Sequence, residues 1–115
     1  MRNGQALWRP DRSKPEIVGD LLLASHPNGR AYLQFSKALP IVAARLEGAS
    51  WEVEFPPEGK RYAAAARPPA RIVWLQLLRQ FRGEVPSSNW QVTQPSPEEI
   101  TFEDSKRGER LEVQF

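Results

Sequence analysis

The chain has 115 residues and a mass of 13.1 kDa, a length that supports one domain and excludes two cores joined by a linker. Hydrophobic residues make up 40% and charged residues 26%, which excludes a disordered chain, and no apolar stretch is long enough for a membrane span. There is no Cys and one His, His26, so disulfides, thiolate metal sites and cysteine nucleophiles are excluded. A net charge of +2 with no long basic run predicts that nucleic acid is not a partner.

The first sixteen residues differ in composition from the rest. They are polar, contain Pro10 and Pro15, and include no apolar region typical of a secretion signal. We therefore predict a loosely ordered N-terminal arm over residues 1–16 and a single β-rich domain over residues 17–115.

Apolar and polar residues alternate along most of residues 17–66, which is the period of a β-strand with one buried face. The turn sequence His26-Pro27-Asn28-Gly29 predicts a hairpin, because Pro presets φ and Asn-Gly accepts the turn conformations that follow. The alternation predicts strands over Ile17–Ser25, Ala31–Ser36, Ile41–Glu47 and Ser50–Phe55. The Ala-rich segment Lys60–Ala66 suits helix or strand, and its position between Pro-rich turns favours a strand.

One amphipathic helix is predicted from Pro69 to about Arg82. Pro is tolerated at the first helical position, and Gly83 is a suitable residue just beyond the end. Its apolar face carries Trp74, Leu77, Leu78 and Phe81, widened by Ile72, Val73 and Leu75. Such a wide face predicts that the helix is covered on more than one side or exposes apolar surface to a ligand.

After a loop over residues 84–88, three alternating segments around Trp90–Val92, Ile100–Phe102 and Leu111–Phe115 predict a strand meander. The predicted fold is therefore mainly β, a curved antiparallel sheet of about seven or eight strands curled around its own interior, with the helix on or across its concave face. The expected core consists of Leu33, Phe35, Trp51, Val53, Phe55, Trp90, Val92, Ile100, Phe102, Leu111 and Val113.

The sequence contains no recognisable catalytic constellation. His26 is explained by its turn, and the paired carboxylates Glu52/Glu54, Glu98-Glu99 and Glu109/Glu112 fall on faces that alternation marks as wet. There is no phosphate-binding glycine loop, zinc spacing or dinucleotide fingerprint. We predict that the protein is not an enzyme and uses no cofactor and no metal.

The aromatic inner face admits two interpretations. Rings at period-two spacing are typical of an ordinary core, but a curled sheet covered by one helix is also a shape that holds apolar ligands. In the second interpretation the cavity wall is formed by Phe35, Trp51, Phe55, Trp74, Leu77, Leu78, Phe81, Trp90 and Phe102.

A resemblance supports the second interpretation. The segments Gly19-Asp20-Leu21-Leu22-Leu23, HPNG, YLQFSKALPIVAARLEGASWEVEFPP, KRYAAAARPPARIVWLQLLRQFRG and the final LEVQF resemble, in order and in helix placement, the bacterial lipoprotein-localisation proteins of the LolA/LolB-like class. The resemblance covers Ile17–Phe115. It implies a half-open barrel with an apolar cavity for acyl chains, located in the periplasm or at the inner face of the outer membrane rather than in the cytoplasm.

Three hypotheses follow. The first is a carrier without catalysis that binds a lipid or an acylated protein and has no membrane span, with peripheral membrane contact left open. The second is a protein-interaction module with a filled core and a protein partner. The third, and least favoured, is a nucleic-acid-binding barrel, which would need exposed aromatic residues among Arg residues.

Overall fold

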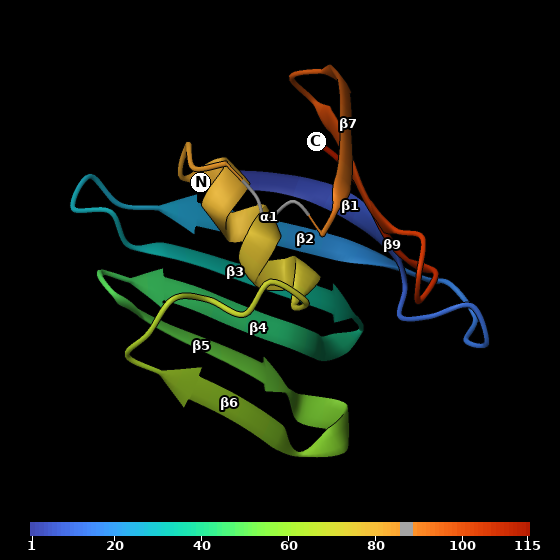
Figure 1. Cartoon of the computed structure of the whole chain (residues 1–115), viewed down its shortest axis with the longest axis horizontal. Coiled ribbons are helices and arrows are strands. Elements are labelled where there is room, and N and C mark those ends of the chain that lie inside the picture. Colours follow the sequence, from blue (N-terminus) through green and yellow to red (C-terminus); the bar gives the residue numbers. More distant parts are fainter. Residues whose placement is uncertain (86–88) are drawn as a thin grey trace.

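The computed structural model describes residues 1–85 and 89–115. In this part of the chain, nine antiparallel strands form one curved sheet that does not close, and one α-helix packs against it (Figure 1). The elements are β1 (Arg2–Arg9), β2 (Ile17–Ser25), β3 (Ala31–Lys37), β4 (Leu39–Glu47), β5 (Ser50–Phe55), a 3₁₀ turn (Pro56–Glu58), β6 (Lys60–Ala64), α1 (Val73–Phe81), β7 (Gln91–Ser96), β8 (Glu99–Asp104) and β9 (Glu109–Gln114). The predicted fold class is confirmed.

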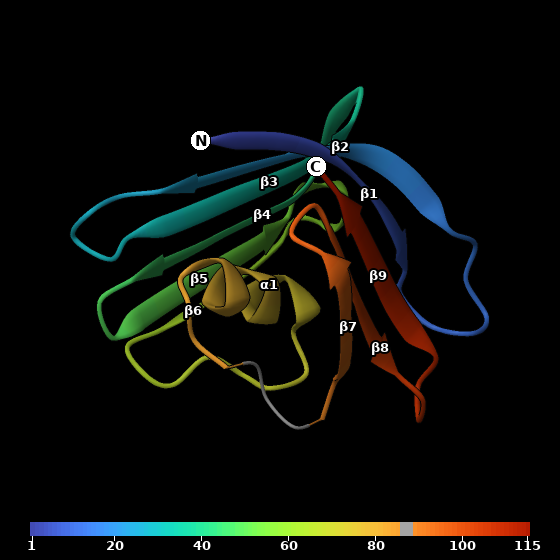
Figure 2. The same ribbon diagram turned by 90° about the horizontal axis from the view of Figure 1, so that it is seen from above.

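The strand order is β6-β5-β4-β3-β2-β1-β9-β8-β7, so β6 and β7 are the two free edges. Figure 2 shows that β7, β8 and β9 turn steeply away from β2–β6, which leaves α1 in the hollow between the two parts of the sheet. The helix packs on β3, β4 and β5. The sheet is curved and unclosed with the helix packed against it, as the alternation predicted.

The prediction of a loosely ordered arm over residues 1–16 was wrong. Residues 2–9 form β1, which pairs with β2 from Arg2 to Trp8 and with β9 from Gln5 to Arg9. This strand joins the two parts of the sheet and accounts for the ninth strand, one more than the range predicted. The following loop is also attached, because the Arg12 guanidinium donates to the carbonyls of Ser105 and Lys106 in the β8–β9 turn.

Two glycines allow the sheet to curve at β1 and β2. A Cβ atom on Gly4 would collide with the backbone oxygen of Gln114, and one on Gly19 would collide with that of Ser36. The rings of Phe115 and Phe35 lie over these two positions. Glycine inside a strand typically marks such a close backbone approach, and an aromatic ring covers the exposed strand there.

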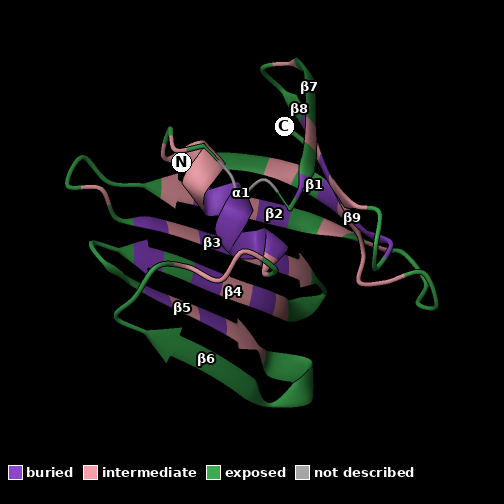
Figure 3. Ribbon diagram, viewed as in Figure 1, coloured by how far each residue is buried: buried purple, intermediate pink, exposed green. Residues whose placement is uncertain are grey.

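The predicted register of the sheet is confirmed. Trp51 and Trp90 are buried, whereas Glu52 is only partly buried and Gln91 is exposed. All but two of the predicted core residues are buried, and the exceptions, Phe55 and Val92, are partly buried against the core. Figure 3 shows buried positions on α1 and along β3–β5, with β6 exposed along its whole length. Alternate residues of β2, β8 and β9 are buried as well.

The helix begins at Val73 instead of Pro69. The carbonyls of the preceding residues accept side-chain hydrogen bonds, from Gln76 Nε2 to Pro69 (3.1 Å), from Trp90 Nε1 to Ala70 (2.6 Å) and from Arg107 to Arg71 (3.1 Å). These contacts anchor a turn in which Ile72 N–H donates to Pro69 O (3.4 Å), so the two prolines introduce the helix without belonging to it.

The other predicted boundaries fit closely. The β2–β3 hairpin turns at His26–Arg30, where His26 N–H donates to Arg30 O (2.8 Å) and Gly29 has a φ of 90°. The strand over Lys60–Ala66 is present as β6 but ends at Ala64. The predicted loop over residues 84–88 falls partly on residues 86–88, which lie outside the described residues.

Candidate ligand pocket at the start of α1

A pocket of about 390 Å³ lies where the N-terminal end of α1 meets both parts of the sheet. We call it the α1 pocket. Its walls come from β1, β5, β6, the segment before α1, and the turn and strand at β9, and its lining residues are Trp8, Pro10, Trp51, Phe55, Tyr62, Pro69, Arg71, Ile72, Val73, Trp74, Arg107 and Glu109. Five aromatic rings therefore share one pocket with two guanidinium groups and one carboxyl group.

The aromatic wall is organised around Trp74. Its ring stacks on Phe35 with 5.0 Å between centroids, and Trp8 meets it edge-on at 5.2 Å. At the outer rim, Phe55 and Tyr62 form a second edge-on pair at 6.4 Å. Aromatic pairs in these geometries contribute beyond the area they bury, so the inner wall is a rigid surface, whereas Tyr62 is 46% exposed at the rim.

Glu109 forms the polar side of the pocket. Its Oε2 accepts a hydrogen bond from Trp8 Nε1 (3.0 Å), and its Oε1 accepts one from Arg107 (2.8 Å). Arg107 also donates to Asp104 Oδ2 (3.0 Å). These contacts connect β1 to the β8–β9 turn and fix one wall of the pocket.

Burial raises the pKa of the Glu109 carboxyl from its ordinary value of 4.5 to about 7. The hydrogen bond from Trp8 and the charge of Arg107 favour the ionised form but do not offset the loss of hydration, and Asp104 and Asp11 add to the upward shift. Glu109 therefore changes its charge near neutral pH, and the pocket becomes more positive as Glu109 is protonated.

Several hydrogen-bond donors of the pocket have no partner among the described residues. The indole N–H groups of Trp51 and Trp74 are buried and unpaired. The first residue before α1, Ile72, provides no side-chain cap for the helix. Buried donors are normally satisfied in folded proteins, so this concentration of unpaired N–H groups distinguishes the pocket from the surrounding core.

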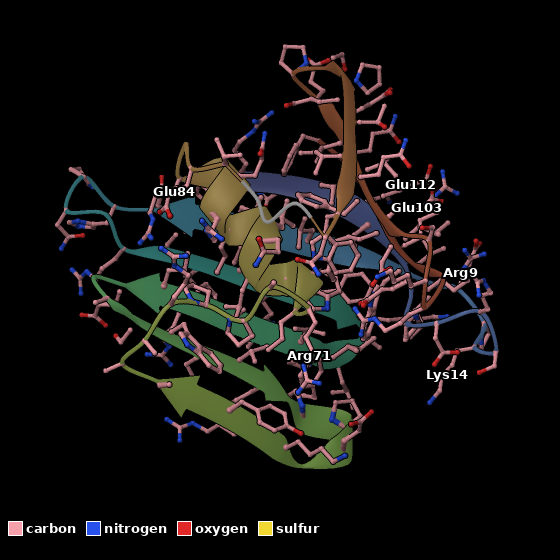
Figure 4. All side chains as sticks on the ribbon, in the orientation of Figure 1. Arg9, Lys14, Arg71, Glu84, Glu103 and Glu112 are labelled. Carbon is pink, nitrogen blue, oxygen red and sulfur yellow. The ribbon has the colours of Figure 1, made fainter. Side chains whose placement is uncertain are left out.

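Arg71 stands at this end of the helix, and Figure 4 shows it on the concave side of the sheet, with Glu84 marking the opposite end of α1. Its side chain is exposed and makes no hydrogen bond or ion pair with any described residue. A second hollow, of about 340 Å³, lies at the C-terminal end of α1, but there Arg79 and Arg82 are both paired with Glu84.

The structure brings together three of the nine predicted cavity residues. Trp51, Phe55 and Trp74 line the α1 pocket. Five others are buried in the core around the helix or under the meander, namely Phe35, Leu77, Leu78, Trp90 and Phe102, and Phe81 is partly buried at the end of α1. The predicted cavity residues therefore divide between a pocket at the N-terminal end of the helix and a buried core around the middle of it.

The sequence interpretation missed Trp8, Tyr62, Arg71, Arg107 and Glu109 as pocket residues. Trp8 had a signal, because Gly4, Ala6 and Trp8 fall on one face of a strand and Gln5 falls on the other. Arg107 and Glu109 had no such signal, since the β8–β9 turn and the start of β9 reach the pocket only through the pairing of β1 with β9.

Among residues 1–85 and 89–115, no group of three or more His, Asp or Glu side chains is placed to hold a metal ion. Within the same residues, no helix is long and apolar enough to cross a membrane. No family model and no curated protein sequence matches the chain.

Proposed function

We propose that this protein is a binding or carrier protein that holds one apolar chain, from a lipid or from an acylated protein, in the α1 pocket. The observation that carries the proposal is the set of five aromatic rings around one partly open pocket beside a buried core. Small-molecule sites are typically concave and apolar with a few polar groups, as this pocket is.

The size of the pocket supports a single chain. Its volume of about 390 Å³ lies near the lower end of the range for small-molecule sites, about 300–1,000 Å³. Each buried methylene contributes about 0.8 kcal/mol, so a chain of moderate length offsets the loss of translational freedom on binding. The filled core around Phe35 and Leu78 leaves no comparable room under the middle of the helix.

The residue types in the lining favour binding over catalysis. The described lining contains no Ser, Thr, Cys, Lys or His, and its one hydroxyl, that of Tyr62, lies at the exposed rim. A lone carboxyl with a pKa near 7 fits a group that adjusts the charge of a binding site.

A protein-interaction module is the second candidate, and one observation favours it. The edge strand β6 is exposed at all five residues and has a free hydrogen-bonding side. An edge of this kind accepts an added strand from a partner. This candidate predicts that the α1 pocket stays empty in the presence of lipids.

The deciding experiment titrates the protein with 1-decanol and with a palmitoylated peptide while tryptophan emission is recorded. Three of the four Trp residues line the pocket, so we expect a saturable spectral shift. Tyr62→Ala, which removes a ring at the exposed rim, should weaken binding severalfold. Tyr32→Ala, on the opposite face of the sheet, is the matched control and should bind normally.

The absence of any saturable signal with either compound would contradict the carrier proposal and leave the interaction module. A loss of binding in both tyrosine variants would also contradict it, because the effect would not come from the pocket.

A further inference from the structure

We infer that the ligand of the α1 pocket carries a carboxylate head, which binds at the N-terminal end of α1 between Arg71 and Arg107 while the chain lies along the aromatic rings. This inference rests on the proposed function and adds the chemical class of the ligand. It is carried by the placement of cationic and unpaired donor groups at one end of an otherwise apolar pocket.

Arg71 is the first of these groups. It lines the pocket, and its guanidinium makes no hydrogen bond or ion pair with the described residues. A guanidinium presents a planar set of donors that matches the two oxygens of a carboxylate. Arg71 is therefore available to a ligand without any existing contact being broken.

Arg107 is the second group, and it is held in place. Its Nε donates to Asp104, and one terminal nitrogen donates to Glu109 and to the Arg71 carbonyl. The other terminal nitrogen has no partner among the described residues, which leaves donors on a fixed side chain. Through its contact with the Arg71 carbonyl, Arg107 also keeps the two guanidinium-bearing segments adjacent.

The helix and the indoles add to the same preference. The N-terminal end of α1 carries the positive end of the helix dipole, and it has no side-chain cap. Trp51 and Trp74 belong to the same lining, and their buried indole N–H groups, just behind the pocket surface, are unpaired. Each of these groups stabilises an oxygen acceptor, and none stabilises a cation.

Glu109 is the one group in the lining that opposes an anion. Both of its oxygens already accept hydrogen bonds, from Trp8 and from Arg107, so they face protein donors. With two guanidiniums against one carboxyl that is partly protonated at neutral pH, the lining has a net positive charge.

An aromatic pocket with one carboxyl group also suggests a quaternary ammonium ligand held by cation–π contacts. The two guanidiniums argue against it, because a cation entering the pocket would meet them at the same end. This alternative is an outcome of the test below.

The test compares three single-chain compounds of equal length, decanoate, 1-decanol and decyltrimethylammonium, each below its critical micelle concentration at pH 8. We expect decanoate to bind at least threefold more tightly than decanol, and decyltrimethylammonium to bind most weakly. Equal affinities for decanoate and decanol would overturn the carboxylate inference and leave the carrier proposal intact. Tightest binding of decyltrimethylammonium would also overturn the inference, whereas no binding of any compound would overturn the carrier proposal itself.

The variant Arg71→Gln tests the role of this one side chain. Arg71 makes no hydrogen bond or ion pair with the described residues that its replacement would remove. The variant should weaken decanoate binding about three- to tenfold and leave decanol binding unchanged. Arg67→Gln, an exposed residue of the same segment outside the α1 pocket, is the matched control and should change neither affinity. Unchanged decanoate binding by Arg71→Gln, or an equal loss for decanol, would overturn the assigned role of Arg71.

Discussion

The two ends of α1 differ in how their polar groups are satisfied. At the C-terminal end, Glu84 N–H donates to Arg79 O (2.8 Å) and Gly83 N–H to Gln80 O (3.1 Å), which closes the helix in the Schellman arrangement. The carboxylate of Glu84 also pairs with Arg79 and Arg82. At the N-terminal end, the helix has no side-chain cap and the neighbouring indoles keep unpaired N–H groups.

The contacts at the C-terminal end hold the helix in place, whereas the groups at the N-terminal end are open to a ligand. Arg82 also donates to Gly29 O (3.1 Å), which connects the C-terminal end to the β2–β3 hairpin. That end stabilises the fold through contacts that are already complete. The N-terminal end is held by ring packing and by hydrogen bonds to the carbonyls that precede it, while the Arg71 guanidinium makes no hydrogen bond or ion pair with the described residues. Changes at the two ends should therefore have different effects on stability, on pH dependence and on binding.

The largest expected effect is the loss of the ring that anchors the N-terminal end. Trp74→Ala should lower the free energy of unfolding by about 3–5 kcal/mol, because it removes a buried ring that packs on Phe35 and Trp8. Phe81→Ala, at the partly buried C-terminal end, should cost only about 1–2 kcal/mol. Urea denaturation measures both values.

If Trp74→Ala does not fold, Trp74→Phe provides the comparison, since it keeps an aromatic ring in the stack and should cost less than the alanine variant. Equal losses at Trp74 and Phe81 would contradict the assignment of the anchor to the N-terminal end.

The second effect is the opposite pH dependence of the two ends. The pKa of Glu109 is raised by burial from 4.5 to about 7, so between these values the folded protein binds more protons than the unfolded chain. The contribution of Glu109 is complete below pH 4.5 and is lost as the pH rises through 7, a change on the order of 3 kcal/mol. The pKa of Glu84 is lowered by its hydrogen bond with Arg82, so its contribution is present above pH 4.5 and lost at lower pH.

Urea denaturation at pH 5 and pH 8 tests the Glu109 contribution. Glu109→Gln should remove most of the stability difference between the two pH values, because the amide does not titrate and still accepts from Trp8. Glu112→Gln, on the opposite face of β9, is the matched control and should keep the difference. An unchanged pH dependence in Glu109→Gln would show that other groups cause it.

The sequence predicted those parts of the fold that depend on residues close to one another in the chain. Alternation placed Trp51, Val53 and Phe102 inside the sheet, and the turn at His26–Gly29 defined a hairpin. The start of α1 was placed four residues early, because residues 69–72 form a separate turn whose carbonyls accept from side chains at distant positions, Trp90 and Arg107. Local propensity does not include such contacts.

The strand β1 and the polar half of the pocket were missed for a related reason. Polar residues and Pro10 made the first residues look unlike a strand, yet Gly4 and Ala6 are small because β1 crosses close to its neighbours. Trp8 meets Glu109, 101 positions later, only because β1 pairs with β9. Alternation identifies which face of a strand is buried, but it does not identify the neighbouring strand. It therefore predicted part of the aromatic wall of the α1 pocket and none of its charged groups.

The smallest expected effect isolates the C-terminal end from binding. Gly83 has a φ of 88°, which an alanine adopts only with strain, and nothing lies within 4 Å of the position of an added Cβ. Gly83→Ala should therefore lower the free energy of unfolding by about 1 kcal/mol through backbone strain alone. Decanoate affinity, measured by tryptophan emission at a temperature where both proteins are folded, should stay unchanged because the pocket lies at the other end of α1. A loss of affinity comparable to that of Arg71→Gln would mean that the two ends are coupled through the helix, and that the completed contacts at the C-terminal end also position the binding groups.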